Sequence, residues 1–152
     1  MSGIISYFDE AKPPERTALE KRWGKTILSF EGWTAVPNAI LHYQEELELS
    51  AMDLNVLMQV LTFWREKERY PFPSYRRIAD RIGVSKKTVQ RSIRKMQELG
   101  YISREPGYLH GRGTNVLVLD GLVQKLKTYA NEEIDRRATD KHTYGFDPAG
   151  PR

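Results

Sequence analysis

The chain has 152 residues, no cysteine and a formal net charge of +4, and 39% of its residues are apolar. This length and apolar content suffice for one hydrophobic core, and the lack of cysteine excludes disulfides and thiolate metal sites. No apolar run approaches the length of a membrane span and no signal-peptide core is present, so the sequence predicts a cytoplasmic protein without a membrane partner.

The N-terminal stretch has little periodicity and contains Pro13-Pro14, so residues 1–30 are expected to form a mobile arm. Within it, Lys25 to Phe30 favours a strand. Trp23 stands beside several cations, so it either packs in the core or belongs to an arm that lies against a charged partner.

Two helices are predicted next. One spans Pro37 to Glu46, with a proline in its first turn and with Ile40 and Leu41 facing inward. The other starts at Ala51 after a spacing close to a capping box and runs to about Lys67. Its apolar residues recur three or four apart on one face, which is typical of a core stripe or, as an alternative, of a partner-binding face. They are Leu54, Leu57, Leu61 and Trp64.

A pair of helices separated by a tight turn follows. Ser74 is the predicted N-cap of the first, which ends at Gly83, and Ser85 is the predicted N-cap of the second, which ends at Gly100. So short a connection makes the helices cross steeply, and the small side chain of Ala79 leaves room for this crossing. The pattern predicts a helix-turn-helix.

The second helix has two unlike faces. Val89, Ile93, Met96 and Leu99 form its apolar side. About 100° to 200° away lie three cations and an amide, a set suited to base edges in a DNA major groove. These are Lys87, Gln90, Arg91 and Arg94. Residues 75–95 carry eight cations and one anion, a local charge of +7 against +4 for the whole chain, as expected of a footprint for phosphate.

A hairpin is predicted after Gly100. Tyr101 to Arg104 favours a strand, Pro106 to Gly113 a glycine-rich turn, and Thr114 to Leu119 a returning strand. Such a hairpin is a wing, and His110 and Arg112 near its tip are candidates for contact with phosphate or a minor groove. The predicted fold class is therefore mainly α with a small β-hairpin wing, a winged helix-turn-helix of the α+β type.

The last predicted helix carries apolar residues at helical spacing between 122 and 130. It either covers its own core or pairs with a second copy in a homodimer. The domain organisation is thus an arm at 1–30, a winged helix-turn-helix domain with its C-terminal helix at 31–131, and a disordered polar tail at 132–152.

The run from Pro73 to Val89, continuing to Leu99-Gly100-Tyr101-Ile102, resembles the winged helix-turn-helix of bacterial regulators of the GntR type. The segments Val36-Pro37-Asn38-Ala39-Ile40-Leu41 and Phe72-Pro73-Ser74-Tyr75, together with Trp33, resemble the DNA-binding domains of plasmid and phage replication initiators. The two resemblances together span about Trp33 to Leu119.

These resemblances imply roles for particular positions. The major-groove helix would contribute Ser85, Lys86, Lys87, Gln90, Arg91 and Arg94, to which we add Lys95, the next cation of the same helix. The start of the preceding helix would meet phosphate through Ser74, Tyr75, Arg76 and Arg77, and Arg112 would act from the wing.

Catalysis and cofactors are not expected. His42, His110 and His142 stand alone, without the spacing of a metal site or a nucleophile triad, and no metabolite-binding region follows the wing. The sequence predicts a protein of bacterial or mobile-element origin that binds double-stranded DNA, associated with the nucleoid when DNA-bound. Transcriptional regulation is the first interpretation, and the alternatives are binding to a replication origin and a winged-helix module for protein–protein interaction.

Overall fold

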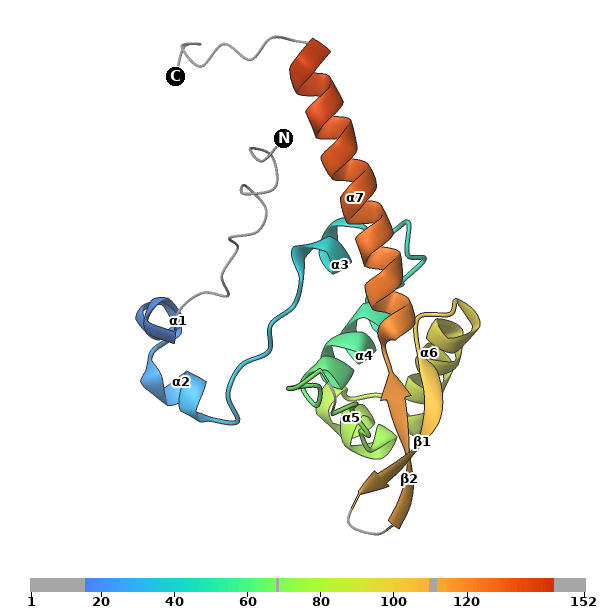
Figure 1. Cartoon of the computed structure of the whole chain (residues 1–152). Helices are drawn as coiled ribbons and strands as arrows, with labels where there is room; N and C mark the ends of the chain where they lie inside the picture. The colour runs from blue at the N-terminus through green and yellow to red at the C-terminus, as the bar shows by residue number, and fades with distance from the viewer. Residues whose placement is uncertain (1–15, 68, 110–111, 144–152) are drawn as a thin grey trace. The chain divides into compact units, whose positions relative to one another are not determined.

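The computed structural model describes residues 16–67, 69–109 and 112–143 (Figure 1). The chain divides into two units, residues 1–35 and 36–152.

The first unit contains two short helices, α1 (Arg16–Trp23) and α2 (Lys25–Ser29). Gly24, at a φ of 80°, separates them. The predicted strand at Lys25 to Phe30 is therefore wrong. A strand needs a neighbour for its backbone hydrogen bonds, and within the described residues the sheet consists of one two-stranded hairpin elsewhere in the chain.

The second unit begins with α3 (Asn38–His42), which is shorter than the predicted helix from Pro37 to Glu46. The chain turns back after it, with Glu48 at a φ of 57° and the Gln44 side-chain amide donating to the Leu49 carbonyl at 3.0 Å. This reversal leads the chain into the next helix. Ile40 is buried as predicted, but Leu41 is 46% exposed.

Helix α4 (Ala51–Leu61) starts with the predicted capping box: the Ser50 hydroxyl accepts from the Asp53 amide, and the Asp53 carboxylate accepts from the Ser50 amide. It ends six residues before the predicted Lys67. Backbone bonds from Phe63 to Val60 and from Trp64 to Leu61 span three residues and tighten the chain out of the helix.

Helices α5 (Tyr75–Ile82) and α6 (Lys86–Glu98) follow, then strands β1 (Ser103–Leu109) and β2 (Arg112–Val118), then α7 (Asp120–Thr143). Apolar residues from these elements and from α3 and α4 form one core. Its most deeply buried members include Ile40, Leu47, Val56, Leu57, Val60, Ile78, Val89, Ile93, Met96, Leu117, Leu119 and Leu122. The predicted stripe of α4 belongs to this core, because Leu57 and Leu61 are buried and Leu54 and Trp64 pack against it.

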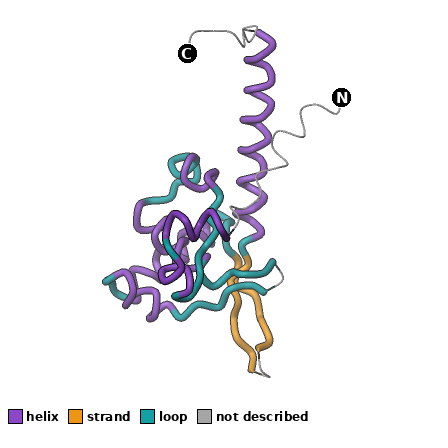
Figure 2. The backbone as a smooth tube through the Cα atoms, turned by 90° about the vertical axis from the view of Figure 1, so that its left-hand side faces the viewer, coloured by secondary structure: helices purple, strands orange, loops and turns teal. Residues whose placement is uncertain are grey.

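The wing is a two-stranded antiparallel hairpin, drawn in orange in Figure 2. Its strands are longer than predicted, since Pro106 and Gly107 pair with Asn115 and Thr114 instead of forming the turn. Both strands are edge strands, where a proline without an N–H is tolerated. The Leu117 amide also donates to the Pro71 carbonyl at 2.7 Å, which ties the segment before α5 to the wing.

Helix α7 starts directly after β2 and extends from the helical core in the direction opposite to the wing (Figures 1 and 2). Its first turn lies against the end of α6, where the Leu122 amide donates to the Tyr101 carbonyl at 3.1 Å. It continues to Thr143 through the first part of the stretch predicted to be disordered. Glu133 forms ion pairs with Arg136 and Arg137, three and four residues on, and pairs at this spacing stabilise a helix. The rest of the predicted tail, 144–152, lies outside the described residues.

Candidate nucleic-acid interface

Helix α5 starts at the predicted cap. The Ser74 hydroxyl accepts a hydrogen bond from the Arg77 amide at 3.3 Å, and this satisfies one of the free N–H groups of the first turn. Arg76 and Arg77 are exposed. Tyr75 is half-buried, and burial raises the pKa of its hydroxyl while the positive charge of Arg104 opposes this shift. The start of α5 thus presents two arginines to solvent.

The turn between α5 and α6 has the predicted geometry. Gly83 has a left-handed backbone with φ 70°, and the Val84 amide donates to the Ala79 carbonyl at 3.0 Å. The Ser85 hydroxyl then caps α6 by accepting from the Thr88 amide at 3.1 Å. Ala79 is buried beneath the crossing helices, where a larger side chain would separate them. These features fix the direction in which α6 leaves the turn.

Helix α6 is amphipathic, as predicted. Val89, Ile93 and Met96 are at most 1% exposed and attach it to the core. Its opposite face is polar, with Gln90 half-buried among exposed cations. The exposed cations are Lys86, Lys87, Arg91 and Arg94. Within the described part of the chain none of these four forms an ion pair, so their charges are available to a partner.

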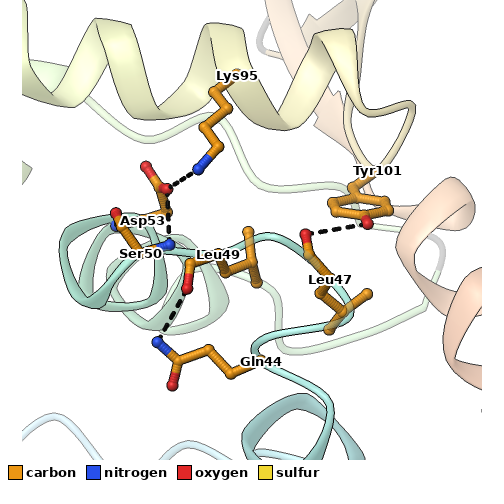
Figure 3. Close-up of polar contacts among 7 residues, drawn as sticks. All are labelled: Gln44, Leu47, Leu49, Ser50, Asp53, Lys95 and Tyr101. Carbon is orange, nitrogen blue, oxygen red and sulfur yellow. Dashed lines mark hydrogen bonds and ion pairs between the residues drawn. The ribbon is translucent and has the colours of Figure 1, made fainter.

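Lys95, which the sequence analysis includes in the recognition set, differs from these cations because its amine is paired within the fold. Its Nζ lies 2.7 Å from Oδ2 of Asp53 on α4 (Figure 3). Asp53 is 4% exposed, and an unpaired carboxylate so deeply buried would be costly. Lys95 lies about 40° around the helix from Arg91, at the border of the cationic face. Its side chain is 41% exposed, although its amine reaches Asp53.

The pKa of Asp53 reflects this environment. Burial acts to raise it, but hydrogen bonds from Lys95, Ser50 and Ser92 outweigh burial and lower the pKa to about 2. The Asp53 carboxylate is therefore charged over the whole pH range in which proteins are usually studied. The Asp53–Lys95 pair therefore joins α4 to α6.

A recess of about 550 Å³ lies where the start of α5, the first half of α6 and the base of the wing meet, and we call it the wing groove. Its lining residues include three cations, two side-chain amides and no carboxylate. The cations are Arg76, Lys86 and Arg104, and the amides are Gln90 and Asn115. Phe72, 49% exposed, contributes an apolar wall.

Phe72, Arg104 and Asn115 line the wing groove, although the sequence analysis did not predict them as site residues. The strand register explains how the two wing residues reach it. Arg104 pairs with Leu117 and Asn115 pairs with Pro106, so these residues share one face of the hairpin. Leu117 is buried, which directs this face towards the helices. Side chains alternate between the two faces of a strand, so Arg104 and Asn115 could have been placed on the face of the buried Leu117. This would have required strands predicted at their full length.

The predicted wing-tip residues are only partly placed. His110 lies outside the described residues. Arg112 is the first residue of β2 and pairs with Leu109 at the far end of the ladder. Its backbone therefore lies six residues along β2 from Val118, which is at the base of the wing.

The predicted pairing helix packs against its own chain. Leu122 is buried, and Tyr129 stacks on Tyr43 with ring centroids 4.8 Å apart and donates from its hydroxyl to the Glu46 carbonyl at 3.2 Å. Of the two alternatives for residues 122–130, the structure shows the covering of the chain's own core. A homodimer that used this face would have to displace these contacts.

No cluster of three or more potential metal-binding side chains occurs among the described residues. Within the same part of the chain, no helix combines the length and the apolar character needed to cross a membrane.

Comparison with known proteins supports the fold. A family model described as a helix-turn-helix domain matches residues 47–102, from the turn before α4 to the start of the wing. Among solved structures, the chain is similar to the N-terminal domain of the DnaD protein from Geobacillus kaustophilus HTA426. The TM-score is 0.54 and the sequence identity 22%, over 75% of this chain and 94% of that one. At this identity the likeness concerns the fold. No curated protein matches the sequence significantly.

Proposed function

Because this chain is a winged helix-turn-helix protein, we propose that it binds double-stranded DNA with sequence preference, the exposed face of α6 entering the major groove. The observation that carries the proposal is the arrangement of charge. Four cations of α6 that have no ion-pair partner among the described residues surround Gln90, and the adjoining wing groove has no carboxylate in its lining.

Different residues have different tasks in this proposal. Arg91, Arg94 and Gln90 read base edges, since guanidinium groups match the acceptors of guanine and a glutamine amide matches adenine. Ser85, Lys86 and Lys87, at the start of α6, and Ser74, Tyr75, Arg76 and Arg77, at the start of α5, meet the phosphate backbone. Backbone contacts supply much of the affinity and make it salt-dependent, while base contacts supply the preference.

Occupation of a site next to a promoter, and hence transcriptional regulation, is the first role we propose. Binding at a replication origin is the second, favoured by the resemblance of Phe72-Pro73-Ser74-Tyr75 and the upstream segments to replication initiators. Both roles use the same interface. They differ in where the bound sequence lies and in whether it is repeated there.

A winged helix can instead bind a protein. Such a module would be expected to present apolar or mixed-sign side chains on α6, whereas this face carries Lys87, Arg91 and Arg94 around an amide. If the partner is a protein, the positive charge of this face predicts an acidic one. Selection of bound DNA duplexes distinguishes this alternative from DNA binding.

The test is selection of bound duplexes from a random library with the purified chain at two salt concentrations. The proposal predicts recovery of a defined motif whose binding weakens at the higher salt. Recovery of an inverted repeat would indicate a dimer on DNA. Salt-sensitive binding without any motif would refute sequence preference, and no binding to duplex DNA at low salt would refute the proposed function as a whole.

A further inference from the structure

The wing groove receives side chains from α5, from α6 and from the wing. Its cations come from three separate elements: Arg76 from α5, Lys86 from α6 and Arg104 from β1. Bringing three like charges together costs energy in the free protein, because no carboxylate in the lining compensates them. An anionic partner with spaced negative charges would relieve this repulsion.

Arg104 is well placed to meet such a partner. It lies one residue into β1, close to the base of the hairpin, and pairs in register with the buried Leu117. Its charge acts on the Tyr75 hydroxyl at the start of α5, so it lies near that helix and not only near the wing. Arg104 is exposed and has no ion-pair partner among the described residues.

Asn115 lies on the same face of the hairpin, two residues before Leu117. Across the recess, Gln90 of α6 presents a second amide, and Phe72 presents an apolar ring. A phosphodiester chain has the matching chemistry: phosphate oxygens for the cations, a deoxyribose for the apolar wall, and acceptors for the amide donors.

We infer that the wing groove holds one strand of the DNA backbone and that Arg104, at the base of the wing, is its principal phosphate-binding residue, in preference to the residues of the wing tip. The inference rests on the proposed function and adds a contact to it. The wing then contributes to binding mainly through the strand residues Arg104 and Asn115. Binding of the DNA phosphate backbone on the wing side would fix the register of α6 in the major groove.

The experiment measures the affinity of purified variants for a 30-base-pair duplex, of the selected motif or of random sequence, by fluorescence anisotropy over a series of salt concentrations. Arg104→Ala is expected to weaken binding about tenfold at low salt and to reduce the salt slope by about 0.9, the value for one lost phosphate contact. Lys127→Ala is the matched control, because it removes an exposed cation from α7, outside the groove. It should leave the slope unchanged.

Two further variants keep the result interpretable. Asn115→Asp places a negative charge in the groove at almost constant volume and should weaken binding more than Asn115→Ala does. Arg112→Ala should weaken binding less than Arg104→Ala. Thermal melting of each variant checks that the fold is retained, which is expected because Arg104 and Asn115 are exposed.

The outcomes separate this inference from the function on which it rests. If the unaltered chain binds duplex with a salt slope and Arg104→Ala behaves like Lys127→Ala, the groove assignment is refuted while DNA binding stands. A larger loss in Arg112→Ala than in Arg104→Ala would also refute it, in favour of the wing tip. If the unaltered chain does not bind duplex at low salt, both the function and the groove assignment fail.

Discussion

The two sides of α6 use the same kind of residue for different purposes. On the inner side, Lys95 pairs with the buried Asp53 and joins α6 to α4. On the outer side, Arg91 and Arg94 have no acidic partner among the described residues and lie open to solvent. A cation satisfied within the fold contributes to stability, whereas an exposed unpaired cation contributes little. Stability and the proposed DNA binding should therefore be separable by mutation along a single helix.

The largest loss of stability is expected at the contact between α7 and the end of α6. A Cβ added to Gly121 would lie 1.9 Å from the Gly100 carbonyl oxygen, which is a backbone atom that cannot rotate away. Gly121→Ala should therefore lower the free energy of unfolding by roughly 3 kcal/mol, as measured by urea denaturation. Stability within about 0.5 kcal/mol of the unaltered chain would contradict the close packing of α7 on this junction.

The second effect concerns the Asp53–Lys95 pair itself. Asp53→Asn removes the charge but keeps the shape, and should cost about 2 kcal/mol at pH 7, since a pKa of about 2 instead of 3.8 corresponds to that free energy. Because the folded-state pKa lies below the ordinary value, this stabilisation is present above about pH 4 and is lost as the pH falls towards 2.

The difference in unfolding free energy between the two proteins, measured from pH 6 to pH 2, should therefore shrink at low pH. A constant difference would show that the pair does not hold the helices through its charge. Sequence preference on DNA should survive in Asp53→Asn under conditions where the variant is folded.

The sequence predicted the helix-turn-helix well because its signals are local. Ser74, Gly83 and Ser85 define both helices through caps and a left-handed turn, and each was confirmed. The ion pair of Lys95 was not predicted, because the direction of a cation at the border of a helical face depends on Asp53, 42 residues earlier in the chain. An ion pair between residues so far apart in the chain cannot be predicted from the local sequence pattern.

The remaining differences have a similar origin. Arg104 and Asn115 were missed because the wing strands extend through Pro106 and Gly107, and the cross-strand register that allows this is not local information. Helix α7 runs past residue 131 because Glu133 pairs with arginines one turn on. Composition alone had favoured disorder there. Helix α3 ends early because the backbone leaves helical geometry at Tyr43, and the chain reverses by Glu48.

A smaller effect is expected at Gly83. The space around it is open, with nothing within 4 Å of an added Cβ, so only its φ of 70° opposes a side chain. Gly83→Ala should cost about 1 kcal/mol by thermal or chemical denaturation, clearly less than Gly121→Ala. Equal costs at the two positions would mean that steric overlap at Gly121 is not the cause of its effect.

The smallest effect belongs to the apolar wall of the wing groove. Phe72→Ala should weaken duplex binding by about 0.5 to 1 kcal/mol, the value of a few tens of Å² of apolar surface covered by DNA. Leu41→Ala is its control, since Leu41 is exposed to a similar extent, 46% against 49%, but lies on α3 away from the groove. Equal affinities of the two variants in an anisotropy titration would remove Phe72 from the interface.

Base reading by α6 is tested by the affinity of Arg91→Ala for a selected and a random duplex at one salt concentration, beside that of the unaltered chain. We predict that Arg91→Ala loses about 1 to 3 kcal/mol on the selected sequence and much less on the random one, with an unchanged melting temperature. An equal loss on both sequences would show that the outer face of α6 binds DNA without reading its sequence.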